Sequence, residues 1–168
     1  MPQSRPFDPE TILRLLEHHD VKYILIGNVA ASLHGSPYVT TDVDITPSSH
    51  PDNLVRLAAV LEELDARVRV EAEPNGLPFD CSPETLSRSS ILNLTTRYGD
   101  LNLTFTPAGT GGYDDLNRHA AEITIRETRV VVAALADVIR SKEATGREKD
   151  RLVLPTLRRL LEGLLRDS

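Results

Sequence analysis

The spacing of hydrophobic and polar residues switches repeatedly between a helical and a strand period, which predicts a mixed α/β protein. Apolar residues at helical spacing predict helices over 9–19, 29–33, 51–64, 113–120, 135–145 and 148–165. Short apolar or alternating runs predict strands at 23–26, 42–46, 67–70, 91–96, 101–105, 123–126 and 129–132. The stretch 71–90 contains three prolines and is expected to be a loop with a helical turn at 83–86.

The residues between these segments indicate how the chain is organised. Tyr98-Gly99-Asp100 and Glu127-Thr128 each separate two strand-like runs and predict hairpins. The last two helices are separated by Gly146-Arg147, and Pro155 is expected to bend or split the second of them. We expect a single domain, with a core over 1–133 and a C-terminal helical segment over 134–168 packed on it.

Composition fits a globular protein and excludes several classes. Hydrophobic residues make up 40% of the chain and charged residues 26%, enough for a buried core. Cys81 is the single cysteine, which excludes an internal disulfide or a thiolate zinc cluster. Because the first residues lack an apolar stretch and no run approaches a membrane span, we expect a cytoplasmic protein without a membrane partner. With no Trp, an aromatic platform for stacking bases is not expected.

The charge is divided unevenly along the chain. The formal net charge is −6, which by itself argues against a simple electrostatic nucleic-acid binder. From Arg140 to Ser168, however, eight basic and five acidic residues give +3, which leaves −9 for the preceding 139 residues. This distribution permits a narrow basic surface beside an acidic body.

The most informative motif is Asp42-Val43-Asp44-Ile45, which is separated from Gly27-Asn28 by thirteen residues. Residues i and i+2 of a strand point to the same face, so both carboxylates address one spot while the apolar pair faces the core. Carboxylates of this kind suit Mg²⁺, and burying them without a cation costs several kcal/mol. Gly27 and Asn28 come where a strand turns into a helix, a place that favours a phosphate. The alternative is the solvent face of an edge strand, but the strand–Gly–helix–strand context favours the metal site.

The order of strand, Gly-Asn, short helix, loop and Asp-x-Asp resembles the nucleotidyltransferase superfamily related to DNA polymerase β. The resemblance covers roughly residues 23–161 and implies a minimal nucleotidyltransferase fold, an α/β (α+β) mixed sheet flanked by helices with a C-terminal helical pair. It also implies divalent metals, Mg²⁺ or Mn²⁺, held by Asp42 and Asp44. The implied reaction transfers a nucleoside monophosphate from an NTP, bound in part by Gly27 and Asn28, with release of pyrophosphate.

The segment from Ile139 to Asp150 resembles the Lys-x-x-x-x-x-Arg-x-x-Asp block of the AbiEii/AbiGii branch of that superfamily. This branch contains toxins of toxin–antitoxin systems, including enzymes that add nucleotides to tRNA 3′ ends. The resemblance implies that Lys142 neutralises the triphosphate and that Arg147 contributes to nucleotide binding. Asp150 either orients Lys142 or Arg147 or contacts the acceptor. The other interpretation is a solvated helix with ordinary salt bridges.

One position departs from the superfamily pattern. A third carboxylate usually comes from a neighbouring strand with a Gly-Asp-Leu-Asp-Leu pattern, but here the stretch Gly99 to Leu103 has Asn102 at that position. An amide oxygen can ligate a metal or contact the nucleotide, but it adds no charge and is no general base. Asp100 lies on the same strand face and is a partial substitute. A two-carboxylate enzyme, a slow enzyme and a nucleotide-binding relic all stay open.

Other candidate residues carry less information. His34 either lines the active-site helix or ends it, and His18 and His19 diverge around a helix, so that no joint metal site is expected. Together with the resemblance, the sequence predicts a metal-dependent nucleotidyltransferase. The AbiEii/AbiGii-like block implies a tRNA 3′ end as acceptor and a cognate antitoxin as partner. The alternatives are transfer to a small-molecule or protein hydroxyl and a non-catalytic nucleotide- or partner-binding module.

Overall fold

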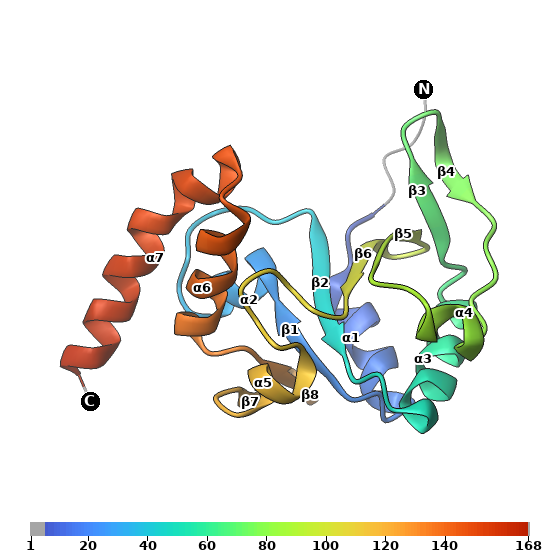
Figure 1. Cartoon of the computed structure of the whole chain (residues 1–168), viewed down its shortest axis with the longest axis horizontal. Coiled ribbons are helices and arrows are strands. Elements are labelled where there is room, and N and C mark those ends of the chain that lie inside the picture. Colours follow the sequence, from blue (N-terminus) through green and yellow to red (C-terminus); the bar gives the residue numbers. More distant parts are fainter. Residues whose placement is uncertain (1–5, 168) are drawn as a thin grey trace.

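The computed structural model describes residues 6–167 and contains one eight-stranded sheet with helices on both faces (Figure 1). The helices are α1 (Pro9–His18), α2 (Gly27–Leu33), α3 (Pro51–Glu63), α4 (Pro83–Ser87), α5 (Tyr113–Asn117), α6 (Leu135–Thr145) and α7 (Glu148–Arg166). The strands are β1 (Tyr23–Ile26), β2 (Asp42–Pro47), β3 (Arg67–Val70), β4 (Glu73–Leu77), β5 (Ile91–Thr96), β6 (Gly99–Thr104), β7 (Ala121–Ile125) and β8 (Thr128–Val132).

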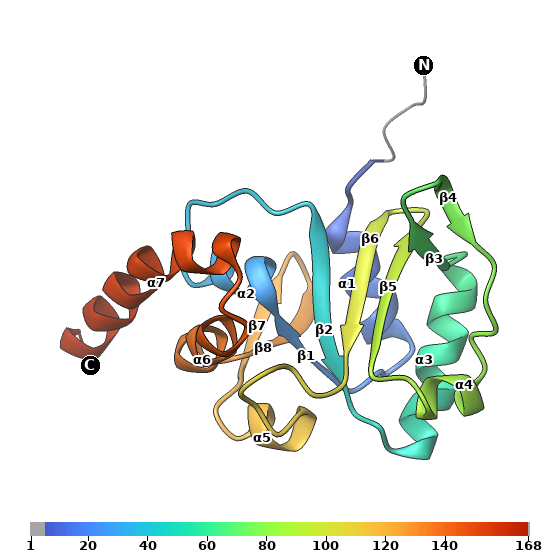
Figure 2. The ribbon, with the colours of Figure 1, turned by 45° about the horizontal axis from the view of Figure 1, so that its top comes forward.

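The sheet is mixed, as expected, and its strand order is β4-β3-β5-β6-β2-β1-β8-β7. β2 runs parallel to β6 and β1 parallel to β8, whereas the other neighbours are antiparallel. Both predicted hairpins form, β5 with β6 and β7 with β8. Two views place α1 and α3 on one face and α6 on the other, with α7 projecting beyond α6 at the C-terminal side (Figures 1 and 2).

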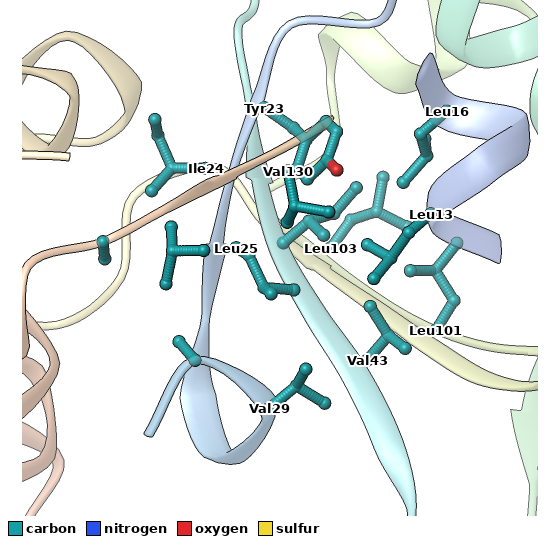
Figure 3. Packing of buried hydrophobic residues seen from close by; sticks show 14 of the residues in the cluster. Leu13, Leu16, Tyr23, Ile24, Leu25, Val29, Val43, Leu101, Leu103 and Val130 are labelled. Atoms are coloured by element: carbon teal, nitrogen blue, oxygen red, sulfur yellow. The ribbon is translucent and has the colours of Figure 1, made fainter. Parts of the chain in front are cut away.

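The hydrophobic core includes a layer between the sheet and α1 with α3, and it continues into buried residues of α2, α6 and α7. Val43 of β2 and Leu103 of β6 point to this face, where Leu13 and Leu16 of α1 meet them (Figure 3). All four side chains are buried, as is Ile45, the other apolar residue of the Asp-x-Asp motif. The prediction that Val43 and Ile45 face the core is therefore confirmed.

The opposite face of β2 and β6 is polar because side chains alternate along each strand. The register places Asp42 opposite Asp100 and Asp44 opposite Asn102 across the parallel pair. Polar groups far apart in sequence thus meet on one face, at the end of the sheet where β1 leads into α2. The fold positions the candidate site by this pairing.

Three expectations about elements were wrong. The expected loop over 71–90 contains the strand β4, whose Pro74 is tolerated because β4 is an edge strand and needs fewer N–H donors for pairing. α2 begins at Gly27 rather than at Val29, and α5 ends at Asn117 rather than near 120.

Pro155 does not split the last helix, which is continuous over Glu148–Arg166. The proline is exposed, so that the carbonyl group it leaves unpaired can bind water. Leu154 and Leu157 beside it are buried, and α7 packs against α6. Packing of this apolar stripe maintains the helix through the proline.

None of the helices within residues 6–167 combines the length and the apolar character needed to cross a membrane.

The core packing predicts a large effect of removing one buried leucine. Replacing Leu103, which is 0% exposed, by alanine should lower the free energy of unfolding by about 2–5 kcal/mol because it leaves a cavity under α1. Ile91→Ala on the neighbouring strand is the control, because this side chain is 60% exposed and its loss should cost less than about 1 kcal/mol. Urea denaturation followed by circular dichroism measures both, and equal losses would contradict this description of the core.

Candidate active site

The two predicted carboxylates lie side by side and share one hydrogen-bonding partner. Asn102 Nδ2 donates to Asp42 Oδ2 and to Asp44 Oδ1, at 3.0 Å in each case. The amide comes from β6, and the parallel register of β2 and β6 places it directly opposite Asp44. Asn102 therefore faces the carboxylates with its nitrogen and not with the oxygen that could ligate a metal.

The orientation of this amide is determined by Arg69 on β3, a residue that sequence analysis did not single out. Arg69 Nη2 donates to Asn102 Oδ1 at 2.8 Å, and Nη1 lies 3.1 Å from Asp100 Oδ2. Arg69 Nη1 also donates to the backbone oxygen of Leu94 at 3.2 Å. Asp100, the expected substitute for the third carboxylate, is thus paired with Arg69.

Gly27 brings the backbone of α2 against Asp44. Its φ of +70° lies in the left-handed region, which favours glycine. A side chain here would also collide with Asp44, because an added Cβ would overlap Oδ2 and lie 2.9 Å from Cβ and Cγ of that residue. The glycine is therefore required both by its own backbone and by the closeness of the carboxylate.

The pKa of the Asp44 carboxyl is raised above its ordinary value, first by burial and then by the charge of Asp42. The hydrogen bond from Asn102 and the charges of Lys142 and Lys149 act in the opposite direction. Lys149, at the start of α7, is a second residue of this environment that sequence analysis did not assign to the site. Two carboxylates and two lysines from distant parts of the chain therefore share one electrostatic environment.

Lys142 of α6 is buried, with 8% of its surface exposed. Its Nζ donates to Asn28 Oδ1 at 2.9 Å and lies 3.5 Å from Asp150 Oδ1. Burial lowers the pKa of this lysine, while the charges of Asp150 and Asp44 partly oppose the shift. The bond to Asn28 fixes the ammonium group beside the first turn of α2, next to Gly27.

Asp150 is the group that stabilises the buried lysine. It is 1% exposed and accepts hydrogen bonds at 2.8 Å from Thr145 Oγ1 and from Arg147 Nε. Its burial raises the pKa of the carboxyl, but the bonds from Arg147 and Thr145 outweigh this and lower it overall. Asp150 thus lies in the interior, in contact with Lys142, Arg147 and Thr145.

The residues present fit a divalent cation at Asp42 and Asp44. Two partly buried, mutually repelling carboxylates are the donor set that a hard cation prefers. Within residues 6–167, no three His, Cys, Asp or Glu side chains gather in a way that could hold a metal. Mg²⁺ in proteins is commonly held by one or two carboxylates together with water and substrate phosphates, which is compatible with this pair.

His34 ends α2, as one of the two interpretations of its sequence context suggested. It is the C-cap residue, and its Nε2 donates to the backbone oxygen of Ala133 at 2.8 Å. This bond ties the end of α2 to the segment between β8 and α6. The residue has a structural contact of its own and is placed outside the carboxylate cluster.

Two pockets lie at the opposite end of the sheet from the carboxylates. One, of about 400 Å³, is lined by residues that include Ser48, His50 and Thr106. The other, of about 180 Å³, lies beside Tyr23 at the start of β1. Because both are distant from the acidic cluster, the chemistry of Asp42 and Asp44 is a better guide to the site than the size of a pocket.

Two solved structures share the fold of this chain. A lincosamide antibiotic adenylyltransferase, LnuA, solved with lincomycin bound, matches with a TM-score of 0.61 and 16% identity, covering 94% of this chain and 99% of that chain. A protein from Thermotoga maritima described as a nucleotidyltransferase matches with a TM-score of 0.57 and 15% identity, covering 97% and 99%. The chain has a nucleotidyltransferase fold. Neither models of protein families nor the sequences of curated proteins give a match.

Gly27 lies so close to Asp44 that a single added methyl group is expected to disturb both residues. Gly27→Ala should lower the free energy of unfolding by about 1–3 kcal/mol and displace Asp44, because the backbone is left-handed and the new Cβ overlaps the carboxylate. Gly163→Ala in α7 is the matched control, since nothing lies within 4 Å of its added Cβ, and it should stabilise the helix by about 0.5–1 kcal/mol. Chemical denaturation of both variants tests this, and a Gly27→Ala protein as stable as the wild type would refute it.

The raised pKa of Asp44 predicts that its charge destabilises the protein without a cation. The folded state holds this proton at higher pH than the unfolded state, whose pKa is near the ordinary 3.8. The stability from this carboxyl is therefore present below pH 3.8 and is lost as the pH rises through the raised value. Asp44→Asn should accordingly raise the melting temperature at pH 7 in a chelator, with a difference that disappears near pH 3 to 4. A variant less stable than the wild type at pH 7 would contradict this.

Proposed function

We propose that this chain is a divalent-cation-dependent nucleotidyltransferase that transfers a nucleoside monophosphate from an NTP to an acceptor hydroxyl. The observation that carries the proposal is the convergence of Asp42 and Asp44 with the Lys142–Asn28 pair beside Gly27. Lys142 comes from α6 and the carboxylates from β2, yet the charges of Lys142 and Asp44 act on each other. A carboxylate pair for a cation next to a buried ammonium for phosphates suits phosphoryl transfer.

The two carboxylates provide the cation site of the proposed reaction. The bound cation supplies charge neutralisation and alignment of the phosphates. Asp42 and Asp44 hold it through their oxygens, and the backbone of Gly27 keeps Asp44 in place because a side chain there would displace the carboxylate. The oxygen of the acceptor hydroxyl forms a bond to the α-phosphorus as the bond from that phosphorus to the α–β bridging oxygen breaks. Pyrophosphate leaves with the bridging oxygen, and the hydroxyl proton passes to water.

Lys142, Asn28 and Arg147 are proposed to handle the triphosphate. Because the Asn28 amide oxygen accepts from Lys142, the amide nitrogen is left as the group that donates to a phosphate. Lys142 stabilises the charge that develops on the leaving pyrophosphate. Arg147 is bound to Asp150 through Nε, but its side chain is 59% exposed and remains accessible to a nucleotide.

For the acceptor, we propose a tRNA 3′ end, with the chain acting as the toxin of a toxin–antitoxin pair. The support is the AbiEii/AbiGii-like block that contains Lys142, Arg147 and Asp150. A small-molecule hydroxyl is the second candidate acceptor, and the fold shared with the lincosamide adenylyltransferase supports it. Cytoplasmic location and an antitoxin partner stay predictions that follow from the sequence.

Transfer of label from each of the four NTPs tests the proposal. The protein, Mg²⁺ and α-labelled NTP are incubated with total tRNA, with a panel of small hydroxyl compounds including lincomycin, or without acceptor. We expect label on one acceptor class, its loss in Asp44→Asn, and a fall of about 100-fold or more in Lys142→Met because the leaving group loses its counter-charge.

Lys22→Met is the matched control for the lysine variant. Lys22 pairs with Asp20 at the other end of the sheet, so its loss should leave transfer unchanged. Circular dichroism establishes that the Asp44 and Lys142 variants are folded. Absence of label on every acceptor from a folded, nucleotide-binding protein would reject the enzyme in favour of a binding module.

A further inference from the structure

The side-chain amide of Asn102 lies between the carboxylates of Asp42 and Asp44 and is hydrogen-bonded to both. A single nitrogen donates one hydrogen bond to each of them, both at 3.0 Å. Asn102 is itself buried, with 9% of its surface exposed, whereas Asp42 and Asp44 are half-buried, so the amide reaches the two charges from the interior of the protein. The amide N–H groups supply the partial positive charge that separates and holds Asp42 and Asp44.

The amide cannot turn round while Arg69 is in place. Its oxygen accepts from Arg69 Nη2 at 2.8 Å. A rotation of 180° would point this oxygen at two carboxylates and the NH₂ group at a guanidinium, which is unfavourable at both ends. Arg69 is in turn held by Asp100 and by the backbone oxygen of Leu94. The hydrogen bonds from Arg69 through Asn102 to the carboxylates therefore run in one direction. Arg69 donates to the amide oxygen, and the amide nitrogen donates to Asp42 and Asp44.

We propose that Arg69 and Asn102 form a positioning pair that stands in for a cation in the metal-free protein and competes with the divalent cation for Asp42 and Asp44. The inference rests on the proposed function in that it assigns the carboxylates to a cation. A cation that binds Asp42 Oδ2 and Asp44 Oδ1 has to displace the amide nitrogen. Asn102 offers no ligand in exchange as long as Arg69 holds its oxygen, and the guanidinium charge itself opposes the cation.

If the pair competes with the cation, its removal should raise the affinity for Mn²⁺ and lower the melting temperature of the protein without metal. Arg69→Met removes the opposing charge and frees the amide to present its oxygen. Asn102→Leu, which is similar in size, removes the donors that occupy the carboxylates. Each variant should bind Mn²⁺ without nucleotide about fivefold more tightly or better, and each should melt at a lower temperature than the wild type in a chelator. A residue with a merely structural role would weaken both properties.

Arg67→Met is the matched control. Arg67 lies on the same strand and the same face, two residues away, and its side chain reaches the backbone oxygen of Gly76 at 3.5 Å rather than the cluster. Its replacement should leave the Mn²⁺ affinity unchanged. Asp44→Asn should abolish the binding and thereby locates the Mn²⁺ at the carboxylates.

The experiment is a titration of the full chain with Mn²⁺, in which electron paramagnetic resonance measures the free ion, together with thermal melts in a chelator. Tighter Mn²⁺ binding with a lower melting temperature in both Arg69→Met and Asn102→Leu supports the proposal. Unchanged or weaker binding in these variants overturns it, even where Asp44→Asn abolishes binding and the cation site itself stands. Mn²⁺ binding that survives Asp44→Asn would overturn both the positioning pair and the assignment of the cation site.

Discussion

The repulsion between the carboxylates of Asp42 and Asp44 is the constraint on which the rest of this site depends. Alternation along β2 directs both to one face, and burial removes part of the water that would otherwise screen them. Neighbouring groups oppose this repulsion. The Asn102 amide on β6 donates hydrogen bonds to both carboxylates, and Lys142 of α6 and Lys149 of α7 place positive charge near Asp44. Strands and helices that are distant in sequence are thereby joined around one acidic pair.

Local pattern was sufficient to predict most of the fold and the acidic motif. The alternation of Asp42 to Ile45 identified both the strand and its two faces, and helical spacing located α6 and α7. Such features depend on neighbours in the sequence. The strand β4 was missed because proline argues against a strand in general, whereas an edge strand tolerates it. Whether a strand lies at the edge depends on the strand order of the whole sheet, and the local sequence of β4 does not encode that order.

Arg69 illustrates the same limit at the site. The Arg-Val-Arg-Val run of β3 predicts that Arg67 and Arg69 share a face, but nothing local distinguishes one from the other. The distinction arises from the strand order β3-β5-β6-β2, which carries Arg69 across two strands to Asn102. The sequence showed that Asn102 replaces the aspartate of the superfamily pattern. It did not show that the amide nitrogen faces Asp42 and Asp44, because the orientation of an amide depends on partners that tertiary structure brings together.

The uneven charge of the chain takes on a different meaning in the folded protein. Four of the basic residues of the C-terminal segment are bound to acids: Arg140 to Asp115 and Asp137, Lys142 and Arg147 to Asp150, and Arg158 to Glu143. Much of the positive charge therefore joins the helical pair to the core and to itself, and less of it is free to attract a polyanion. Lys142 and Lys149 act on the pKa of the Asp44 carboxyl. The net charge of this segment thus overstates the positive charge that is free to attract a polyanion.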